Sequence, residues 1–379
     1  MTQTESKELL EYAIKIRRQI HQHPEIGFDL SNTVKIVAGE LEKMGISYSL
    51  EYGQGSVVAE VGSGEKIIAF RADMDALPVE EKADVDFASQ IPGVMHACGH
   101  DSHTAVVLAA AKYLKAHEEE LQNRVRLIFQ PSEEGAVSGA KMLVDAGVME
   151  GVSRIFGSHC ENTLQVGLLG VHEGDYMAAC IPATIRFYGK STHATLPDAG
   201  VDAIAMAAEA YCRMREMVKE EAGNDRYIWS VGHFAGGEVH NVVADLCTMD
   251  ISFRFYNMDF ARRVGEKVQS ICHEIADRFG GKVEIVWYMS TGPVCNDAQT
   301  VACLRQSAAA EGIEVVEQAP RMSSEDFGWY LQKAPGLMFR FGTRNEALGC
   351  TATAHRSDFK IDESGMEPAI RAFVGCAMQ

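Results

Sequence analysis

The sequence predicts an α/β protein whose mixed, largely parallel sheet is interrupted by an inserted, smaller α+β domain. Three observations predict this fold. Short apolar strands alternate with helical segments through the first half of the chain, an order typical of a parallel sheet covered by helices. From residue 181 the order becomes strand, helix, strand, strand, helix, strand, which is that of a ferredoxin-like unit. After residue 292 the α/β pattern resumes, so the smaller unit is an insertion.

The length of the chain agrees with two domains. With 379 residues it is longer than one typical domain. We expect a discontinuous larger domain formed by 1–180 and 293–379, and an inserted domain formed by 181–292. The run Ser290–Pro293 is predicted to be the hinge by which the chain returns, because Gly and Pro favour turns.

The elements of the larger domain follow from their apolar periodicity. Apolar residues at helical spacing predict helices at 8–23 and 34–44, and a continuous apolar run predicts a buried helix at 105–114. Short apolar runs followed by polar residues predict strands at 67–70, 125–129 and 154–156. In the inserted domain the same reasoning predicts strands at 184–188, 227–231, 246–255 and 283–287, with helices at 201–217 and 260–279.

Composition excludes several classes of partner. Lys and Arg number 35 against 53 Asp and Glu, a formal charge of −18 that argues against nucleic acid and anionic membranes. No apolar run approaches the length of a membrane span, and the polar, acidic segment 1–11 does not resemble a signal peptide. Ten scattered cysteines without a CxxC pair indicate reduced thiols. We therefore expect a cytoplasmic protein.

The segment Met95–His103 concentrates side chains that bind metals. It holds three imidazoles, one thiol and one carboxylate directly before the apolar run. Cys98 and His100 are one residue apart, and a thiolate with imidazoles suits zinc, while nearby carboxylates also admit manganese, cobalt or nickel. The alternative is that Cys98 is the nucleophile of a thiol catalytic site.

The other polar residues of this segment have less defined roles. Asp101 is predicted to accept a hydrogen bond from an imidazole that binds the metal, because such imidazoles usually donate their other ring N–H to a carboxylate. His96 and His103 either do the same or are structural.

Polar residues follow three predicted strands of the larger domain. Phe70 precedes Arg71-Ala72-Asp73-Met74-Asp75, Phe129 precedes Gln130-Pro131-Ser132-Glu133-Glu134, and Phe156 precedes Gly157-Ser158-His159-Cys160. Ligands of open α/β sheets bind outside the carboxyl ends of the strands. We therefore expect these three ends and the Cys98 loop to form one crevice.

The adjacent carboxylates Glu133 and Glu134 within this set can have different roles. Glu134 can bind a metal while Glu133 faces the water that the metal activates and acts as a general base. The alternative is that both acids stabilise the start of a helix. His355 is a distant candidate ligand, and His193 follows a strand of the inserted domain. Each is isolated in the sequence, and such a histidine is by itself more often a surface or structural residue than a functional one.

Taken together, the motifs resemble the M20 metallopeptidases, specifically the amidohydrolase branch with N-acyl-amino-acid amidohydrolases, hippurate hydrolases and indoleacetyl-amino-acid hydrolases. The resemblance covers essentially the whole chain. It rests on motifs in a fixed order: His21–Glu25, Arg71–Pro78, Met95–His103, Gln130–Gly135, His193-Ala194 with Pro197, Asn241–Val243, Ser324–Phe327 and His355.

The resemblance implies a site with two divalent metal ions per subunit, Mn²⁺ or Zn²⁺, with Co²⁺ or Ni²⁺ as alternatives. Glu133 is implied as the general base and His193 as the group that stabilises the oxyanion. Asn241 and Arg254 are implied as substrate-binding residues. The implied metal ligands are Cys98, His100, Glu134, His159 and His355.

The same resemblance implies a metal-dependent amidohydrolase that cleaves N-acyl amino acids of the acetyl, benzoyl or arylacetyl type to a carboxylic acid and a free amino acid. The inserted domain is implied to be a lid and the contact of a homodimer. A dipeptidase with the same site and an inactive metal-binding homologue are the alternatives.

The sequence departs from the usual pattern of the family near the expected substrate. None of these differences removes an expected ligand, so they bear on the acyl group that is preferred. Cys160 could in addition supply or displace a ligand. The departures are Cys160, Glu161-Asn162, Ala244, Ser252 and Arg356-Ser357.

Overall fold

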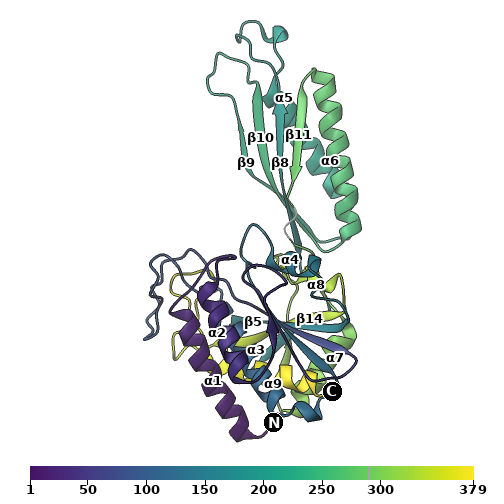
Figure 1. Cartoon of the computed structure of the whole chain (residues 1–379). Coiled ribbons are helices and arrows are strands. Elements are labelled where there is room, and N and C mark those ends of the chain that lie inside the picture. Colours follow the sequence, from purple (N-terminus) through teal and green to yellow (C-terminus); the bar gives the residue numbers. More distant parts are fainter. Residues whose placement is uncertain (289–290) are drawn as a thin grey trace. The chain divides into compact units, whose positions relative to one another are not determined.

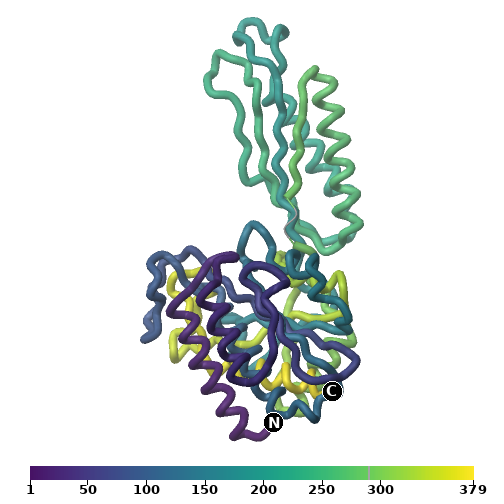
Figure 2. Tube along the Cα trace, in the orientation of Figure 1, coloured from purple at the N-terminus to yellow at the C-terminus, as the bar shows by residue number. Residues whose placement is uncertain are grey.

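The computed structural model in Figure 1 describes residues 1–288 and 291–379. The chain divides into a larger unit, Met1–Tyr176, Val294–Pro320 and Asp326–Gln379, and a smaller unit, Met177–Pro293 and Arg321–Glu325. The chain passes from the larger unit into the smaller one and back again (Figure 2). Ser290, the first residue of the predicted hinge, lies outside the described residues.

The smaller unit contains a segment that the sequence assigned to the larger domain. Residues 321–325 belong to it because their backbone is bound there. Ala178 donates its N–H to Arg321 O at 3.1 Å. Arg254 Nη1 donates to Met322 O at 2.9 Å, and the hydroxyl of Tyr256 donates to Arg321 O at 2.6 Å. The predicted domain boundaries therefore omit this return of the chain.

The larger unit is built on an eight-stranded mixed sheet with the order β1-β2-β4-β3-β5-β14-β6-β13. Its centre is parallel, since β3 pairs with β4 and β5, and β5 pairs with β14, in parallel register. This confirms the predicted mixed, largely parallel sheet. The strands are β1 (Tyr48–Ser49), β2 (Val57–Val61), β3 (Ile67–Asp73), β4 (Arg124–Gln130), β5 (Val152–Gln165), β6 (Leu169–Val171), β13 (Val315–Glu317) and β14 (Gly336–Arg344). A separate two-stranded sheet pairs β7 (Gly174–Met177) with β12 (Val294–Asn296).

Helices pack on this sheet around a buried central helix, α3. Its apolar residues from Ala105 to Ala111 are buried, and it contacts α1, α9 and β3. The helix begins at His100, five residues before the predicted start, so the last four residues of the segment Met95–His103 are helical. The helices are α1 (Gln3–His21), α2 (Ser31–Lys43), α3 (His100–Ala116), α4 (Gly139–Asp145), α7 (Ala298–Ala310), α8 (Gly328–Leu331) and α9 (Met366–Ala377).

One predicted strand end is wrong. The strand predicted at 154–156 extends as β5 from Val152 to Gln165, because it continues to pair with β14, with His159 opposite Arg340. His159 therefore lies within a strand and not after its end. β3 and β4 do end at Asp73 and Gln130, beside the polar residues.

The smaller unit has the predicted strand–helix–strand–strand–helix–strand order. Its antiparallel sheet has the order β11-β8-β10-β9, and every second residue of β10 is buried from Cys247 to Phe255, as expected when helices cover one face. The elements are β8 (Ala179–Tyr188), α5 (Ala203–Ala222), β9 (Tyr227–Gly236), β10 (Leu246–Phe255), α6 (Met258–Phe279) and β11 (Lys282–Trp287). Across the described residues of both units, no helix has the length and hydropathy of a membrane span.

Candidate metal centre

The five residues expected to bind metal lie together in the larger unit, in two groups that have Cys98 in common. The ligand atoms of Cys98, His100 and His159 lie within 4.8 Å of one another. The ligand atoms of Cys98, Glu134 and His355 do so as well. The thiol of Cys98 thus belongs to two groups of three candidate ligands, an arrangement in which one sulfur can serve two ions.

The turn before α3 has the backbone conformation that brings both Cys98 and His100 to the site. Gly99 has a φ of 85°, the left-handed region that glycine adopts without strain. A β-carbon at this position would collide with Cys160 Sγ. Cys98 therefore ends the loop and His100 opens the helix, with their side chains on either side of a residue that must be glycine.

His355 reaches the site through a backbone conformation that is unusual for its residue type. It is one of two non-glycine residues with positive φ in the described chain, at 71°. Its N–H donates to Ala97 O at 2.8 Å, next to Cys98. Its Nε2 lies 3.0 Å from Glu134 Oε1. The strained conformation therefore brings the imidazole to a carboxylate of the cluster.

Several buried polar atoms of this cluster lack hydrogen bonds. Among the described residues, neither ring nitrogen of His100 nor Oε1 of Glu134 makes a well-aligned hydrogen bond, although all three atoms are buried and Asp75 and His355 lie at ion-pair distance. Buried polar atoms are almost always hydrogen-bonded. These orphaned atoms are of the types that bind divalent ions, so the residues present fit a metal site.

The environment of Cys98 does not suit a thiol nucleophile. Burial, together with the carboxylates of Glu134 and Glu133, raises the pKa of the thiol well above its usual range. Burial also lowers the pKa of His159, whose Nε2 lies 3.3 Å from the sulfur. A catalytic cysteine needs a stabilised thiolate, whereas a divalent cation would stabilise the same sulfur directly. The geometry favours the metal interpretation.

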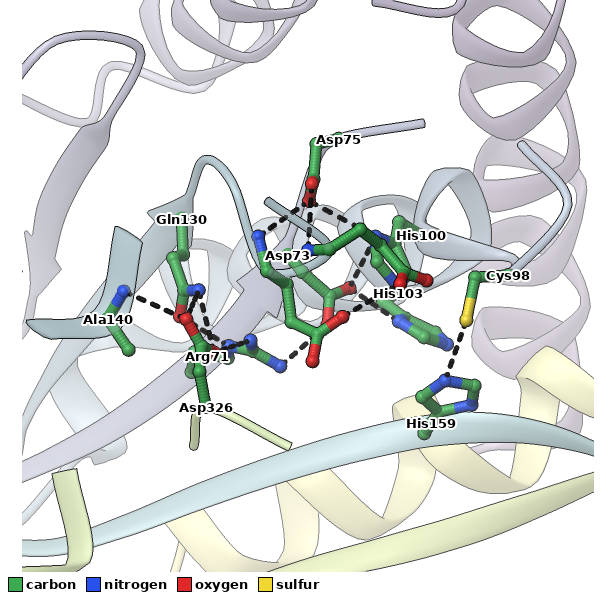
Figure 3. Close-up of polar contacts among 12 residues, drawn as sticks. Arg71, Asp73, Asp75, Cys98, His100, His103, Gln130, Ala140, His159 and Asp326 are labelled. Atoms are coloured by element: carbon green, nitrogen blue, oxygen red, sulfur yellow. Dashed lines mark hydrogen bonds and ion pairs between the residues drawn. The ribbon is translucent and has the colours of Figure 1, made fainter. Parts of the chain in front are cut away.

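Asp75 joins the two glutamates to His100. Its two carboxylate oxygens accept hydrogen bonds from the backbone N–H groups of Glu133 and Glu134 at 3.0 and 3.1 Å. Its Oδ1 also lies 3.3 Å from His100 Nδ1 (Figure 3). Glu133 Oε2 in turn lies 3.9 Å from His100 Nε2, so this carboxylate borders the candidate metal site.

A second buried network fixes the strand ends behind the cluster. His103 Nδ1 lies 2.6 Å from Asp73 Oδ1, and its Nε2 accepts the N–H of Cys160 at 2.9 Å. Arg71 donates to Asp73 at 2.6 Å and to Asp326 at 2.9 Å (Figure 3). Because both ring nitrogens of His103 are occupied, the structure indicates a positioning role for a residue that the sequence left undecided.

Asp101 differs from its prediction. Its carboxylate lies 2.8 Å from Nδ1 of His21 and 3.0 Å from Nε of Arg17, and neither belongs to the five candidate ligands. Burial opposes its ionisation, but Arg17 and His21 hold its pKa well below the usual range. The side chain points from the start of α3 towards α1 and binds that helix, so it is not the expected partner of a ligating imidazole.

His96 and Cys160 complete the surroundings of the loop. Burial lowers the pKa of His96 to about 3, so its ring is neutral, and in the described chain neither of its nitrogens has a hydrogen-bond partner. Cys160 Sγ lies 3.4 Å from Cys98 O. Its backbone binds His103, but His103, His159 and Cys160 also form a group of ligand atoms close enough for a metal.

The expected oxyanion-stabilising residue, His193, and the two expected substrate-binding residues, Asn241 and Arg254, lie in the smaller unit. His193 and Asn241 are exposed neighbours, because residues 193 and 242 form a β-bridge and Ala194 donates its N–H to Asn241 O at 3.0 Å. Arg254 is half-buried on the face of β10 opposite Phe253 and Phe255 and donates to Met322 O.

The sequence reasoning gave no role to Asp73, Asp75 or Asp326. Asp326 accepts hydrogen bonds from Gln130 Nε2 and Ser138 Oγ and so holds both ends of the loop that carries Glu133 and Glu134. The available signal was the pair of acids at the end of β3, where Asp73 is the last residue of the strand and Asp75 follows it. A carboxylate at the end of a buried strand is rarely left without a partner.

Comparison with known proteins adds the family. The model of peptidase family M20/M25/M40 matches residues 69–379. The chain belongs to this family. Among the relatives of this M20 member is the IAA-amino acid hydrolase ILR1-like 4 of Arabidopsis thaliana, 37% identical over 96% of this chain and 84% of the relative. Another is an N-acetylcysteine deacetylase of Bacillus subtilis, 34% identical over 96% of both chains. The chain is thus a hydrolase of the amidohydrolase branch of M20.

Solved structures agree with this assignment. A Bacillus subtilis protein described as a dinuclear metal binding peptidase from the M20 family is 32% identical and has a TM-score of 0.85 over 98% of both chains. A protein from methicillin-resistant Staphylococcus aureus is 26% identical and has a TM-score of 0.93 over 98% of this M20 chain and 97% of its own.

Proposed function

We propose that this M20 hydrolase binds two divalent metal ions per subunit and cleaves the amide bond of N-acyl amino acids. The observation that carries the proposal is the position of Cys98, whose sulfur belongs to two of the candidate ligand groups, one with His100 and His159 and one with Glu134 and His355. The name of the Bacillus subtilis structure, a dinuclear metal binding peptidase, supports the same stoichiometry.

In this proposal one ion is held by Cys98, His100 and His159 and the other by Cys98, Glu134 and His355. When bound, such ions supply Lewis-acid activation of water and of the amide carbonyl. The thiolate and the imidazoles suit Zn²⁺, and the carboxylate also admits Mn²⁺, Co²⁺ or Ni²⁺.

Two carboxylates of the protein have different proposed roles, one in proton transfer and one in positioning. Glu133 takes the proton of the attacking water and delivers it to the leaving amine. Asp75 accepts the backbone N–H groups of Glu133 and Glu134 and lies next to His100. It therefore fixes the position of the proposed base relative to two of the proposed ligands.

The smaller unit is proposed to act as a lid and as the contact of a homodimer. His193 stabilises the oxyanion of the tetrahedral intermediate, and Asn241 and Arg254 bind the carboxylate of the amino acid. The exposure of His193 and Asn241 supports roles in which they contact another surface. The proposed setting of the enzyme is the cytoplasm.

The proposed substrates are small N-acyl amino acids of the acetyl, benzoyl or arylacetyl type. This choice is supported by the names of two relatives, one for IAA-amino acids and one for N-acetylcysteine. A dipeptidase is the second candidate, because relatives of the chain also include thermostable carboxypeptidases of Saccharolobus solfataricus, 34% identical over 94% of this chain.

A hydrolysis panel on protein of measured metal content tests the proposal. Acetyl-, benzoyl-, indoleacetyl- and long-chain-acyl amino acids are compared with free-amine dipeptides of the same amino acids. We expect release of the free amino acid from at least one short or aromatic acyl class. Faster cleavage of the free-amine dipeptides would favour the dipeptidase, and no cleavage by fully loaded protein would favour an inactive metal-binding homologue.

A further inference from the structure

Two buried cysteines outside the candidate metal centre lie on two helices that contact each other, Cys303 on α7 and Cys376 on α9. Their thiols influence each other's ionisation and share a small polar cluster with Ser307 and Gln379. Cys303 Sγ is 3.2 Å from Gln379 Oε1, and Cys376 Sγ is 3.6 Å from Ser307 Oγ. The amide of Gln379 also donates to Ser307 Oγ at 2.7 Å, which closes the cluster. The two thiols are therefore free and reduced, and they are joined through the same two polar side chains.

The two helices approach each other closely at this point. A β-carbon at Gly375 would lie 2.9 Å from Cβ of Ser307 and 3.7 Å from its Cα, so glycine permits the close packing beside Cys376. Disulfides require Cα atoms about 4.4–6.8 Å apart. Gly375 therefore lets the backbones of α7 and α9 approach closely one residue from Cys376 and four residues from Cys303, as a disulfide between the two helices requires.

The two thiols are electrostatically unequal. The hydrogen bond from Cys376 and the nearby guanidinium of Arg154 lower the pKa of Cys303 to about 7, against the opposing effect of burial. Burial and the interaction with Cys303 raise the pKa of Cys376 well above its usual range. At neutral pH Cys303 is therefore the nucleophilic sulfur of the pair. It is also the more accessible one, with 7% of its surface exposed against 2% for Cys376.

We propose that Cys303 is a peroxide-reactive thiol with Cys376 as its resolving partner, so that a hydroperoxide converts the pair to a reversible disulfide between α7 and α9. The sulfur of Cys303 attacks the peroxide, the O–O bond breaks, and an alcohol or water leaves, which gives a sulfenic acid on Cys303. The sulfur of Cys376 then attacks this sulfur and the S–O bond breaks with loss of water. Two thiols are oxidised by two electrons while one peroxide is reduced.

Peptide mapping of the full-length, metal-loaded protein tests this proposal. Trypsin places Cys376 in the peptide that begins at Ala372 and Cys303 in Val283–Arg305, which also contains Cys295. A Cys295→Ala background removes that ambiguity. After brief treatment with hydrogen peroxide we expect these two peptides to be linked, and to separate again with dithiothreitol. Cys272→Ser, a change at another buried cysteine on a different helix, should leave the link unchanged.

Variants separate the roles of the two sulfurs. Cys376→Ser should leave Cys303 as a sulfenic acid that dimedone labels, and Cys303→Ser should prevent both the link and labelling at Cys376. Arg154→Met should slow alkylation of the reduced Cys303 thiol several-fold near neutral pH, because it removes a cation that stabilises the thiolate. Absence of the link in the peroxide-treated parent, or dimedone labelling of Cys376 ahead of Cys303, would overturn the proposal. Because the parent protein is itself assayed, a poorly folded variant does not leave the question open.

Discussion

Asp75 Oδ1 lies 3.3 Å from Nδ1 of His100 while the same carboxylate accepts the N–H groups of Glu133 and Glu134. One buried side chain thus orients a candidate ligand and the peptide that carries another ligand and the proposed base. Asp75→Asn replaces one acceptor by an N–H donor that opposes a backbone N–H, so we expect metal affinity or turnover to fall about 10–100-fold. Metal titration and kinetics measure this, and Asp84→Asn, on the exposed part of the following loop, is the control.

Glu133 and Glu134 should respond differently to the same substitution. Glu133→Gln is expected to keep bound metal and to lower kcat at least ~10²-fold, because it removes the base and not a ligand. Glu134→Gln is expected to lower metal content as well. Measurement of metal content together with kcat separates the two. Near-normal turnover of metal-loaded Glu133→Gln would show that the base is another group.

Removal of metal distinguishes the metal site from a thiol nucleophile. We expect chelation to abolish hydrolysis and added Zn²⁺ or Mn²⁺ to restore it. Cys98→Asp keeps an anionic ligand and should retain more bound metal and more activity than Cys98→Ala. If Cys98 were the nucleophile, chelation would have no effect and both variants would be equally inactive.

The buried His21 should make stability depend on pH. Burial opposes its protonation, but Asp101 and Glu81 raise its pKa above the usual value. A raised folded-state pKa stabilises the protein below the unfolded pKa, about 6.5, and this contribution is lost as the pH rises through the folded-state value. His21→Gln should therefore lower Tm more at about pH 6 than at about pH 9. The exposed His273 provides the control His273→Gln, for which no such difference is expected.

Gly99 should tolerate no side chain. Gly99→Ala combines a positive φ with a collision against Cys160 Sγ, and we expect a loss of at least ~2 kcal/mol in the free energy of unfolding. Gly27 also has positive φ, at 63°, but a β-carbon there meets nothing within 4 Å. Gly27→Ala should therefore lose only about 1 kcal/mol. Denaturant unfolding of both variants isolates the effect of the collision, and equal losses would contradict it.

The alternation of apolar runs was sufficient to predict the two kinds of sheet. A strand or helix must bury one face, and the spacing of apolar residues along the sequence shows which kind of element that face belongs to. Residue types and their order also indicated the family and drew attention to Cys98, His100, Glu134, His159 and His355. Such features depend on local sequence. They do not depend on how the elements finally pack.

The tertiary structure decided what each polar side chain touches. Asp101 is next to His100 in sequence, yet it faces Arg17 and His21, because the first turn of α3 packs against α1. Asp75 was unremarked as a single residue, and its role appeared only when the end of β3 met the Glu133–Glu134 loop. Side-chain direction at a helix start or a strand end is set by contacts with distant segments, so the sequence determined which groups the site contains and the packing determined which of them act together.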